Sequence, residues 1–511
     1  MSGDDDHLNI AIVGSGICGM CSAMALARQG HTVSVYDRDP APPDGDADAA
    51  FFNWQRRGAA QFRHPHAFLG LLCNIIEENY PDLLEAFYAA GARRVDFAEM
   101  LSAELKAAYV AEPGDAKLWV LMCRRATMET VFRRYVESMA NVSIHNGVRV
   151  AGMCTQVDSK GTLDVTGITI EQAGRTSERT ADIVVDASGR LSKFPGWFAA
   201  LDRTVHEEKD DAEIVYYTRH YRLQPGCEEP PRGERPGAGD LGYLKFGVFP
   251  GDNGNFAIIL CLPVAERLLQ RAVRAGETFD QICLSIPGLE PWLVDNRSSP
   301  TTEPFGIADI QSVWRHYVTA GEPLARNFFA VGDAALRTNP LYGRGCSTGI
   351  LHAHILADVI AESRDPVSRA HRFDERTEKE LRPIFSASLR EDRNGIARSA
   401  AVLEGRTLDK PDDLKKWFRL AFGDALGAAS REQLHVLRGA MKSFHLLENP
   451  GAFLKDPKIR RTVLRYMLKG RRRNSAKRLQ PGPGRAEMHD LLGLSADAAV
   501  SPDESEIVNP A

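Results

Sequence analysis

Leu8-Asn9-Ile10-Ala11-Ile12-Val13-Gly14-Ser15-Gly16-Ile17-Cys18-Gly19 is the stretch that decides the fold of this chain. Its apolar first half, rich in β-branched residues, predicts a buried strand that runs directly into Gly14-x-Gly16-x-x-Gly19. In that pattern Gly14 permits a tight turn, Gly16 lets the backbone approach a pyrophosphate, and Gly19 lets a helix pack closely on the strand. The next residues, 20–30, predict that helix, and its amino end would offer unpaired N–H groups to phosphate.

A second strand, predicted over Thr32–Asp37, completes the unit by ending in an acid. Asp37 can accept hydrogen bonds from a ribose diol and disfavours a bound 2′-phosphate, so the unit indicates FAD or NAD rather than NADP. Glycine triplets also recur in loops that bind nothing, and a purely structural βαβ turn is the alternative. Because strand, turn, helix, strand and acid arrive in order, we interpret the unit as a dinucleotide-binding one. The pattern alone does not choose between FAD and NAD.

The overall composition bounds the class of protein. The chain has 511 residues and a formal net charge of −5, so it holds two or three structural units and has no global basic field for nucleic acid. No run of about 18 apolar residues predicts a transmembrane span. The acidic start Met1-Ser2-Gly3-Asp4-Asp5-Asp6 is unlike a secretory signal, and we expect a cytoplasmic protein.

Cysteine and histidine form no complete metal-binding pattern. Cys18-x-x-Cys21 lies at the start of the first helix without a second pair, which predicts packing residues. The spacing of His64-Pro65-His66 does not suit one helix face, and no acidic ligand is near in sequence. We therefore expect no metal. A loop that donates polar contacts to a cofactor or substrate is the favoured interpretation of this stretch, and a merely structural loop is the alternative.

The middle of the chain predicts strands. Residues 142–170 alternate with a period of two, which is typical of an antiparallel meander, and a buried strand then ends at Asp186 before the turn Ala187-Ser188-Gly189. Residues 201–305 are again strand-like, for example at 214–219 and 256–260. We take this region to be a second, sheet-based domain.

A second nucleotide-binding signal follows near residue 330. A strand ends in Gly332-Asp333, and the loop Asn339-Pro340-Leu341-Tyr342-Gly343-Arg344-Gly345 leads into a helix. Asp333 can bond a sugar-alcohol hydroxyl. Gly343 and Gly345 open backbone N–H groups at a helix amino end, where they stabilise negative charge. That arrangement suits the N1/C2 carbonyl edge of a reduced flavin.

Three motifs together resemble the FAD-dependent monooxygenases of the para-hydroxybenzoate hydroxylase type. They are the Gly14 motif with Asp37, the turn Asp186-Ala187-Ser188-Gly189, and Gly332-Asp333 with Pro340-x-x-Gly343-x-Gly345. The stretches Trp54-x-Arg56-Arg57-Gly58, Gln61-x-x-His64-Pro65-His66 and Asp186-Ala187-Ser188-Gly189-Arg190-x-Ser192 look more like a branch that contains bacterial polyketide epoxidases. The resemblance implies an α/β fold. It would have a Rossmann-like FAD-binding domain of the glutathione-reductase type, a mixed β-sheet substrate domain and a C-terminal helical extension.

The resemblance also assigns roles to residues. Asp37, with Arg38 beside it, would hold the adenosine ribose, and Arg125 would approach the FAD pyrophosphate, although the sequence alone is equally consistent with a solvated arginine there. Asp333 would hold the ribityl or diphosphate region, and Pro340, Gly343 and Gly345 would line the isoalloxazine. His66, Tyr216 and Arg219 are the candidates for substrate contact. No side-chain nucleophile is expected, because the flavin carries the chemistry.

The implied reaction is the insertion of one oxygen atom from O2 into an apolar small molecule, by epoxidation or hydroxylation, through a flavin C4a-hydroperoxide. Many flavin hydroxylases have an acid before the glycine of the middle motif, whereas Ser188 precedes Gly189 here. No second Gly-x-Gly-x-x-Gly unit is present either. NADPH or NADH therefore docks transiently near the flavin, or a separate flavin reductase supplies the electrons.

We expect the chain to divide into five parts. Residues 1–200 would be the first part of the FAD-binding domain, 201–305 the sheet domain, 306–390 the last part of the FAD-binding domain, 391–480 a helical extension and 481–511 a mostly irregular tail. Trp417, Phe418, Leu420 and Phe422 are the predicted anchors of the extension. The basic stretch 458–478 is either a membrane-surface helix or a solvated helix packed by its apolar side.

Two other functions stay open on the same scaffold. One is a flavin-dependent reductase or dehydrogenase that acts on isoprenoid-like double bonds, and the other is a non-catalytic escort that binds a lipidated partner. A flavin halogenase is disfavoured, because the Trp-x-Trp-x-Ile-Pro signature of that family is absent.

Overall fold

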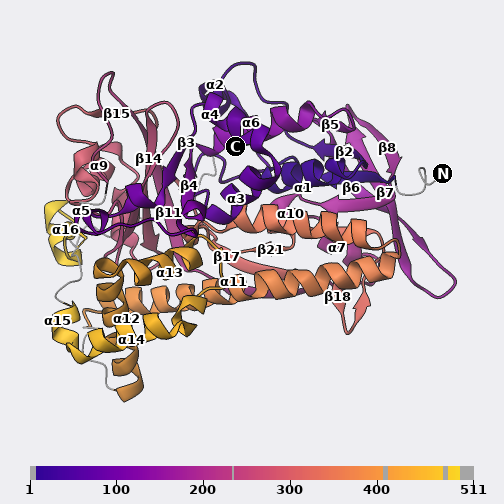
Figure 1. Cartoon of the computed structure of the whole chain (residues 1–511). Coiled ribbons are helices and arrows are strands. Elements are labelled where there is room, and N and C mark those ends of the chain that lie inside the picture. Colours follow the sequence, from indigo (N-terminus) through magenta and orange to yellow (C-terminus); the bar gives the residue numbers. More distant parts are fainter. Residues whose placement is uncertain (1–6, 233–234, 407–412, 476–480, 495–511) are drawn as a thin grey trace.

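The computed structural model describes residues 7–232, 235–406, 413–475 and 481–494 (Figure 1). Its centre is a five-stranded parallel sheet with the order β20-β9-β1-β2-β5. These strands are β1 (Asn9–Val13), β2 (Thr32–Asp37), β5 (Val142–Asn146), β9 (Ile183–Asp186) and β20 (Phe328–Ala330). Because all five run in one direction, the acids that end β2 and β9 and the Gly332-Asp333 turn after β20 lie at the same edge of the sheet.

Helices from distant parts of the sequence cover this sheet. α1 (Ile17–Arg28) connects β1 to β2 and packs against α6 (Arg125–Glu137) and α10 (Gly345–Glu362). Their apolar faces share one core with β1, in which Ile12, Met24 and Ile350 are fully buried. Pro81 separates α3 (Gly70–Asn79) from α4 (Pro81–Ala89), and the shorter helices are α2 (Ala47–Asn53) and α5 (Ala103–Ala107).

The antiparallel meander predicted from residue 142 is confirmed from β6 onward, whereas residues 142–146 form β5, which pairs in parallel with β2. Its strands are β6 (Arg149–Val157), β7 (Leu163–Gln172) and β8 (Arg175–Thr180). In β7, Val165, Ile168 and Ile170 are buried in the core under β9, and the step of three residues from Val165 to Ile168 coincides with a register shift against β6.

A second sheet follows in the order β12-β13-β14-β11-β15, with β16 also paired to β11. Its strands are β11 (Ile214–Leu223), β12 (Ala238–Asp240), β13 (Lys245–Pro250), β14 (Asn255–Pro263), β15 (Ser298–Pro300) and β16 (Phe305–Ile307). α8 (Arg267–Ala272) and α9 (Gly276–Leu284) cover one face of this sheet. Successive residues of β11 point to opposite faces, so its other face is turned toward the first domain.

Smaller sheets connect these parts. They are β10 (His206–Asp211), β17 (Gln311–His316) and β21 (Leu336–Arg337) in one sheet, β3 (Arg93–Asp96) with β4 (Trp119–Met122), and β18 (Val318–Thr319) with β19 (Glu322–Pro323).

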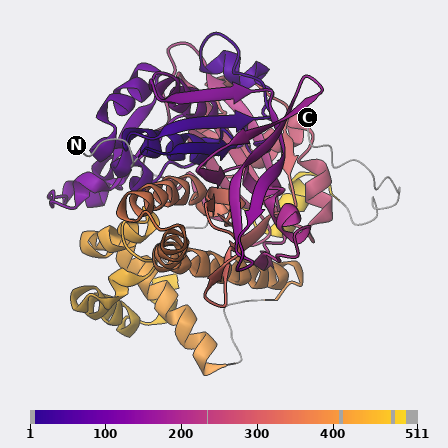
Figure 2. The same ribbon diagram turned by 90° about the vertical axis from the view of Figure 1, so that its right-hand side faces the viewer.

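The longest helix, α11 (Pro366–Leu403), runs beside α10 and reaches the second sheet (Figures 1 and 2). Arg376 pairs with Asp358 of α10, Arg382 pairs with Glu208 of β10, and the Ser399 hydroxyl donates to the Gly242 carbonyl beside β13. The boundary expected at residue 390 is therefore wrong, because it falls inside this continuous helix.

The remaining helices are α12 (Leu414–Glu432), α13 (Leu434–Phe444), α14 (Pro457–Leu468), α15 (Arg471–Ser475) and α16 (Arg485–Leu491). Of the four predicted anchors, Phe422 packs in the core between α12 and α14, whereas Trp417 and Phe418 are exposed, which corrects that expectation. The tail expected to be irregular contains α16, whose Met488 is fully buried against the second sheet. Its last part, residues 495–511, lies outside the described residues, as do 407–412 and 476–480 of the expected extension.

No helix among the described residues is both long and apolar enough to cross a bilayer.

Candidate functional site: a dinucleotide cleft beside an apolar cavity

The turn between β1 and α1 has the geometry that its three glycines predict. Gly14 has φ of +106°, and a Cβ there would lie 2.5 Å from the Ala187 carbonyl oxygen of the turn after β9. A Cβ on Gly19 would lie 2.0 Å from the Gly14 oxygen. Gly16 differs from both, because a Cβ there would have no neighbour within 4 Å. Gly14 and Gly19 are thus required by the fold, whereas Gly16 leaves open space in front of the amino end of α1.

Asp37 ends β2 inside the protein. Its Oδ2 accepts hydrogen bonds from the Ser15 backbone N–H at 2.7 Å and from the Ser15 hydroxyl, and its Oδ1 accepts from the Asp39 N–H at 2.8 Å. Burial would raise the pKa of Asp37, but the Arg56 guanidinium and these hydrogen bonds hold that pKa below its usual value. The carboxylate stays charged and braces the Gly14 turn. Its contact with a ribose remains a prediction.

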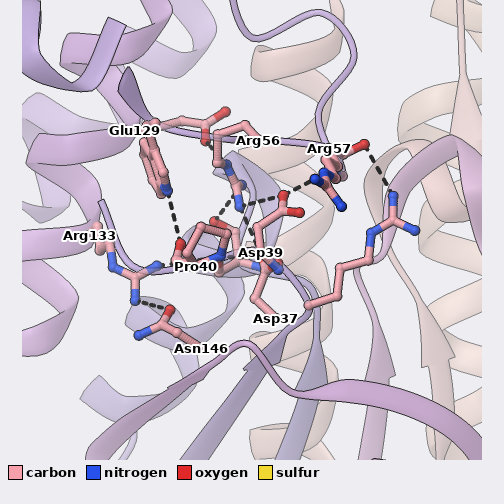
Figure 3. Close-up of polar contacts among 12 residues, drawn as sticks. Asp37, Asp39, Pro40, Arg56, Arg57, Glu129, Arg133 and Asn146 are labelled. Atoms are coloured by element: carbon pink, nitrogen blue, oxygen red, sulfur yellow. Dashed lines mark hydrogen bonds and ion pairs between the residues drawn. The ribbon is translucent and has the colours of Figure 1, made fainter. Parts of the chain in front are cut away.

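Arg56 occupies the centre of a buried cluster of acids (Figure 3). Its guanidinium contacts Asp37 at 3.2 Å, Asp39 at 3.2 Å and Glu129 at 3.0 Å, and its side chain is 3% exposed. Its guanidinium carbon also lies 4.7 Å from the ring centroid of Trp54, two residues earlier in the same loop. Neighbouring Arg57 points to solvent, and its carbonyl accepts a hydrogen bond from the exposed Arg38.

Arg125 links this cluster to the His64-Pro65-His66 loop. It begins α6 and donates to Glu129 at 2.6 Å and to Nε2 of His66 at 2.8 Å. Nδ1 of His66 donates to the His64 carbonyl at 2.8 Å, so the ring is neutral and carries its proton on Nδ1. Burial, and then the charge of Arg125, lower the pKa of His66 well below its usual value. The solvated-arginine alternative for Arg125 is wrong, because the side chain is buried.

Asp333 lies next to this loop. Its Oδ2 accepts a hydrogen bond from the Gln61 amide at 3.5 Å. Burial raises the pKa of Asp333, although the nearby charges of Arg125, Arg337 and Arg190 lower it. The turn that holds Asp333 packs on the start of α1, because a Cβ on Gly332 would meet the Cys18 sulfur at 2.8 Å.

The Pro340 loop brings the amino end of α10 to the same place. Gly343 has φ of +65°, and a Cβ there would lie 3.0 Å from the Ala67 side chain, directly after His66. A Cβ on Gly345 would have no neighbour within 4 Å, and no side chain caps α10 or α1. Cys18 joins the two helix starts, since its thiol donates to the Gly349 carbonyl at 3.3 Å. Both cysteines pack in the core as predicted, Cys21 fully buried and Cys18 half-buried at its side.

The two predicted substrate residues on β11 lie on opposite faces. Tyr216 faces the first domain, where its hydroxyl donates to the Asn339 side chain. Arg219, three residues on, faces α9, and its guanidinium is bound to the Gly276 carbonyl at 2.7 Å and to Asp280 at 2.8 Å. Arg219 therefore does not join the site, which corrects that expectation.

Thr218 and His220 share the face of Tyr216 and were missed from the sequence. Thr218 contacts Nδ1 of His64 at 2.8 Å, and His220 donates from Nε2 to the Arg63 carbonyl at 2.6 Å. Their spacing of two residues from Tyr216 is the signal that could have found them.

An open cavity of about 570 Å³, including its mouth, lies between the second sheet, α11 and the Pro340 loop. Its walls are mostly apolar, and one end is polar. The apolar lining includes Ile214, Cys261, Val264, Leu341, Ile396 and Leu403, and the polar end consists of Lys245, Asn339 and Asp392.

Asp392 organises the polar end of this cavity from α11. Its carboxyl accepts hydrogen bonds from the Asn339 amide at 2.7 Å and from the Tyr342 hydroxyl at 2.8 Å. Burial raises the pKa of Asp392, whereas these hydrogen bonds lower it. The same loop that presents Gly343 and Gly345 is thus tied to the cavity wall, and residue 392 carried no signal in the sequence.

Two buried, neutral histidines between the first domain and the second sheet, His64 and His220, predict that acid lowers the stability of the fold. Burial, and then His220, lower the pKa of His64 to about 3, and burial is also the largest cause that lowers the pKa of His220 to about 4. Below about pH 6.5, His64 and His220 bind protons in the unfolded chain but stay neutral in the folded protein. The free energy of unfolding is therefore unaffected by these two rings above that pH and decreases as pH falls toward 4.

We expect the urea unfolding free energy to fall as pH drops from about 7 to about 5, with a slope that approaches about 1.4 kcal/mol per pH unit for each ring near pH 5. His64→Gln and His220→Gln should each make the slope shallower by about that amount, while His206→Gln, an exposed ring, should leave it unchanged. Equal slopes in all three variants would contradict this assignment.

These features fit a dinucleotide with a flavin at one end. Two uncapped helix starts, those of α1 and α10, lie close together with open space at Gly16 and Gly345. Asp333, Arg125 and His66 lie between them. A helix start attracts negative charge. One of the two starts could thus bind the phosphates of a dinucleotide, and the other the electron-rich carbonyl edge of a flavin.

Comparisons with known proteins agree with this geometry. A family model described as an NAD(P)-binding Rossmann-like domain matches residues 12–66. Protein Rv3254 of Mycobacterium tuberculosis is 25% identical over 489 residues, which cover 91% of this chain and 96% of that protein.

Two solved structures share the fold. A flavoprotein/dehydrogenase from Cytophaga hutchinsonii superposes with a TM-score of 0.59 and 14% identity, covering 91% of this chain and 99% of its own. PqsL from Pseudomonas aeruginosa in complex with 2-aminobenzoylacetate gives a TM-score of 0.51 and 17% identity, covering 78% and 100%. The expected α/β fold class is confirmed: this chain has a Rossmann-like dinucleotide-binding domain in a fold that solved flavoproteins share.

Proposed function

We propose that this protein is a FAD-dependent monooxygenase of the para-hydroxybenzoate hydroxylase type, close to the polyketide epoxidase branch. It would transfer one oxygen atom of O2 to an apolar small molecule, reduce the other to water, and consume two electrons from NADPH or NADH, directly or through a separate reductase. The observation that carries the proposal is the meeting of the α1 and α10 starts beside a mostly apolar cavity.

The side chains of this site would hold the cofactor in three places. Gly16 and the amino end of α1 would receive the pyrophosphate, with Arg125 approaching it from α6. Asp333 would accept a hydrogen bond from a sugar-alcohol hydroxyl. Pro340, Gly343 and Gly345 would line the ring system, and the α10 amides would stabilise negative charge on its carbonyl edge. When bound, FAD supplies the activation of O2.

The cavity supports an apolar substrate. Apolar side chains form most of its wall, which suits an apolar substrate. A bound apolar substrate would displace water from this wall, and oxygen transfer requires that water be kept from the reacting centre. Asn339 and Asp392 would bind one polar group of the substrate at the end next to the Pro340 loop. Tyr216 contacts Asn339 and would position it, whereas His66 would act through Arg125.

The spectrum of the purified protein tests the proposal first. Protein that carries FAD is then supplied with NADPH or NADH, with and without an added flavin reductase, and O2 uptake is measured with a panel of alkenes and aromatic compounds. Uptake that is stimulated by one compound, with one labelled oxygen atom from ¹⁸O2 in the product, is the expected result. Protein that takes up no flavin would contradict the proposal and favour the escort.

A dehydrogenase or reductase acting on isoprenoid-like double bonds is the second candidate. It is favoured by the Cytophaga flavoprotein/dehydrogenase, which superposes over 91% of this chain. Anaerobic turnover that gives a desaturated or hydrogenated product would replace the monooxygenase with this function.

Asp333→Ala is expected to weaken FAD binding. The variant loses a hydrogen bond of the carboxylate worth about 1.5–3 kcal/mol, so the Kd should rise about ten- to a hundred-fold. Fluorescence titration of the apoprotein with FAD measures the effect. Glu207→Ala, a change of an exposed acid on β10, is the control. Equal affinity in wild type and Asp333→Ala would contradict the assignment of Asp333.

A further inference from the structure

The apolar stripe of α12 continues beyond the core that it packs on. Ala421, Ala425, Ala428 and Ala429 of this stripe are buried, with Ala425, Ala428 and Ala429 in the core shared with α14. Leu414, Trp417 and Phe418 continue the same stripe by steps of three and four residues toward the helix start. Leu414 is 80% exposed, Trp417 43% and Phe418 54%, so nothing in the described chain covers them.

The turn between α14 and α15 lies beside the middle of α12, from which the overhang extends. α14 and α15 both pack on α12, and Arg471 of α15 pairs with Asp424 near the middle of α12 at 3.1 Å. The first turns of α12 extend past that point and project from the rest of the molecule (Figures 1 and 2). Leu468, at the end of α14, is 87% exposed.

Basic residues outnumber acids around these apolar side chains, although Asp412 and Asp413 directly precede Leu414 in the sequence. Residues 457–475, which contain α14 and α15, include eight lysines and arginines and no acid. The start of α12 adds exposed Lys415, Lys416 and Arg419. Its N-terminal acid, Asp413, accepts a hydrogen bond from the Lys415 N–H and so caps the helix.

We propose that this surface docks the protein on an anionic lipid bilayer. The surface, called here the basic-apolar face, consists of Leu414, Lys415, Lys416, Trp417, Phe418, Arg419, Leu468, Arg472 and Arg473. Tryptophan, phenylalanine and leucine insert into the boundary between headgroups and acyl chains, while lysines and arginines attract the negative surface. A projecting helix end can enter that boundary without displacing other parts of the protein.

Charge favours a bilayer over other occupants. A second copy of the chain would place one basic-apolar face against another and bring like charges together. An acidic protein partner would satisfy the charges but does not by itself explain three large apolar side chains on the projecting start of α12. Binding to lipid does not depend on the proposed reaction, although it would bring the cavity close to apolar compounds dissolved in the membrane.

Co-sedimentation of the full-length protein with vesicles tests the proposal. We expect binding to an equimolar mixture of phosphatidylcholine and phosphatidylglycerol, little binding to phosphatidylcholine alone, and release when salt is raised from about 0.1 M to about 1 M. Each basic residue near an anionic surface contributes about five-fold to partitioning, so Lys415→Ser with Lys416→Ser and Arg419→Ser should weaken binding about a hundred-fold.

Three further variants distinguish insertion of the apolar side chains from a general effect of net charge. Leu414→Ser with Trp417→Ser and Phe418→Ser should abolish vesicle binding without changing the unfolding midpoint, because these side chains are exposed. Lys160→Ser with Arg175→Ser and Arg179→Ser removes the same charge from the opposite end of the molecule, beside β8, and should bind as wild type does. A vesicle-dependent shift in tryptophan emission should disappear in Trp417→Phe.

Three results would overturn the proposal. One is no sedimentation with either vesicle. Another is an equal loss of vesicle binding in the Lys160 and Lys415 variants, which would show that binding depends on net charge alone and not on this face. The third is a stable dimer in light scattering that the Leu414 variant converts to a monomer, which would assign the face to a second copy.

Discussion

Gly16→Val is expected to purify as a folded but colourless protein. A Cβ at residue 16 has no neighbour within 4 Å, and the backbone there, with φ of −71° and ψ of 179°, is extended and accepts any residue. The valine methyl groups would therefore fill the space in front of α1 rather than strain the fold. We expect the Kd for FAD to rise by at least about a hundred-fold, which corresponds to about 2.7 kcal/mol.

Visible absorbance of the purified protein and FAD titration of the apoprotein measure this effect, and far-ultraviolet circular dichroism checks the fold. Gly196→Val is the matched control, since residue 196 also has open space around it but lies in α7 (Phe194–Ala199), away from the cleft. Gly19→Ala should instead fail to fold, because its Cβ would lie 2.0 Å from the Gly14 oxygen. Full flavin content in Gly16→Val would refute the pyrophosphate site.

Arg56→Met is expected to destabilise the protein by about 3–5 kcal/mol. The guanidinium is the shared partner of Asp37, Asp39 and Glu129, and its side chain is 3% exposed. Methionine fills a similar volume but leaves three buried carboxylates without this cation. Urea unfolding monitored by tryptophan fluorescence measures the loss.

Charge and packing can be separated by pH. Removing the cation raises the pKa of the buried acids, so they take up protons more readily on acidification, and the cost of Arg56→Met should shrink as pH falls from about 7 to about 5. A packing defect would cost the same at both pH values. Arg57→Met changes the exposed neighbour and should have little effect. Equal destabilisation by the two variants would contradict the cluster.

Local pattern predicted the dinucleotide unit well, because its parts are adjacent in sequence. The strand, the Gly14-x-Gly16-x-x-Gly19 turn, α1 and Asp37 all fall within β1–β2, and the turn geometry follows from steric rules that act over a few residues. The Pro340 loop and α10 were predicted for the same reason.

Long-range contacts were not predictable in the same way. Arg56 and Glu129 are 73 residues apart, and Asn339 and Asp392 are 53 apart, so no local pattern joins them. Arg219 is different, since the period of two along β11 already placed it opposite Tyr216. Trp417 and Phe418 have core spacing, but α12 extends past the helices that would have covered them.

α11 restricts how the cleft can move. With 38 residues it is about 57 Å long. Along that length it contacts α10 through Arg376, β10 through Arg382, the Pro340 loop through Asp392 and the second sheet through Ser399. The helix contains Pro383, and its ion pairs through Arg376 and Arg382 are partly exposed. Because the four contacts are spread along its whole length, a change in the spacing of the central sheet and the second sheet would have to break a contact or bend α11.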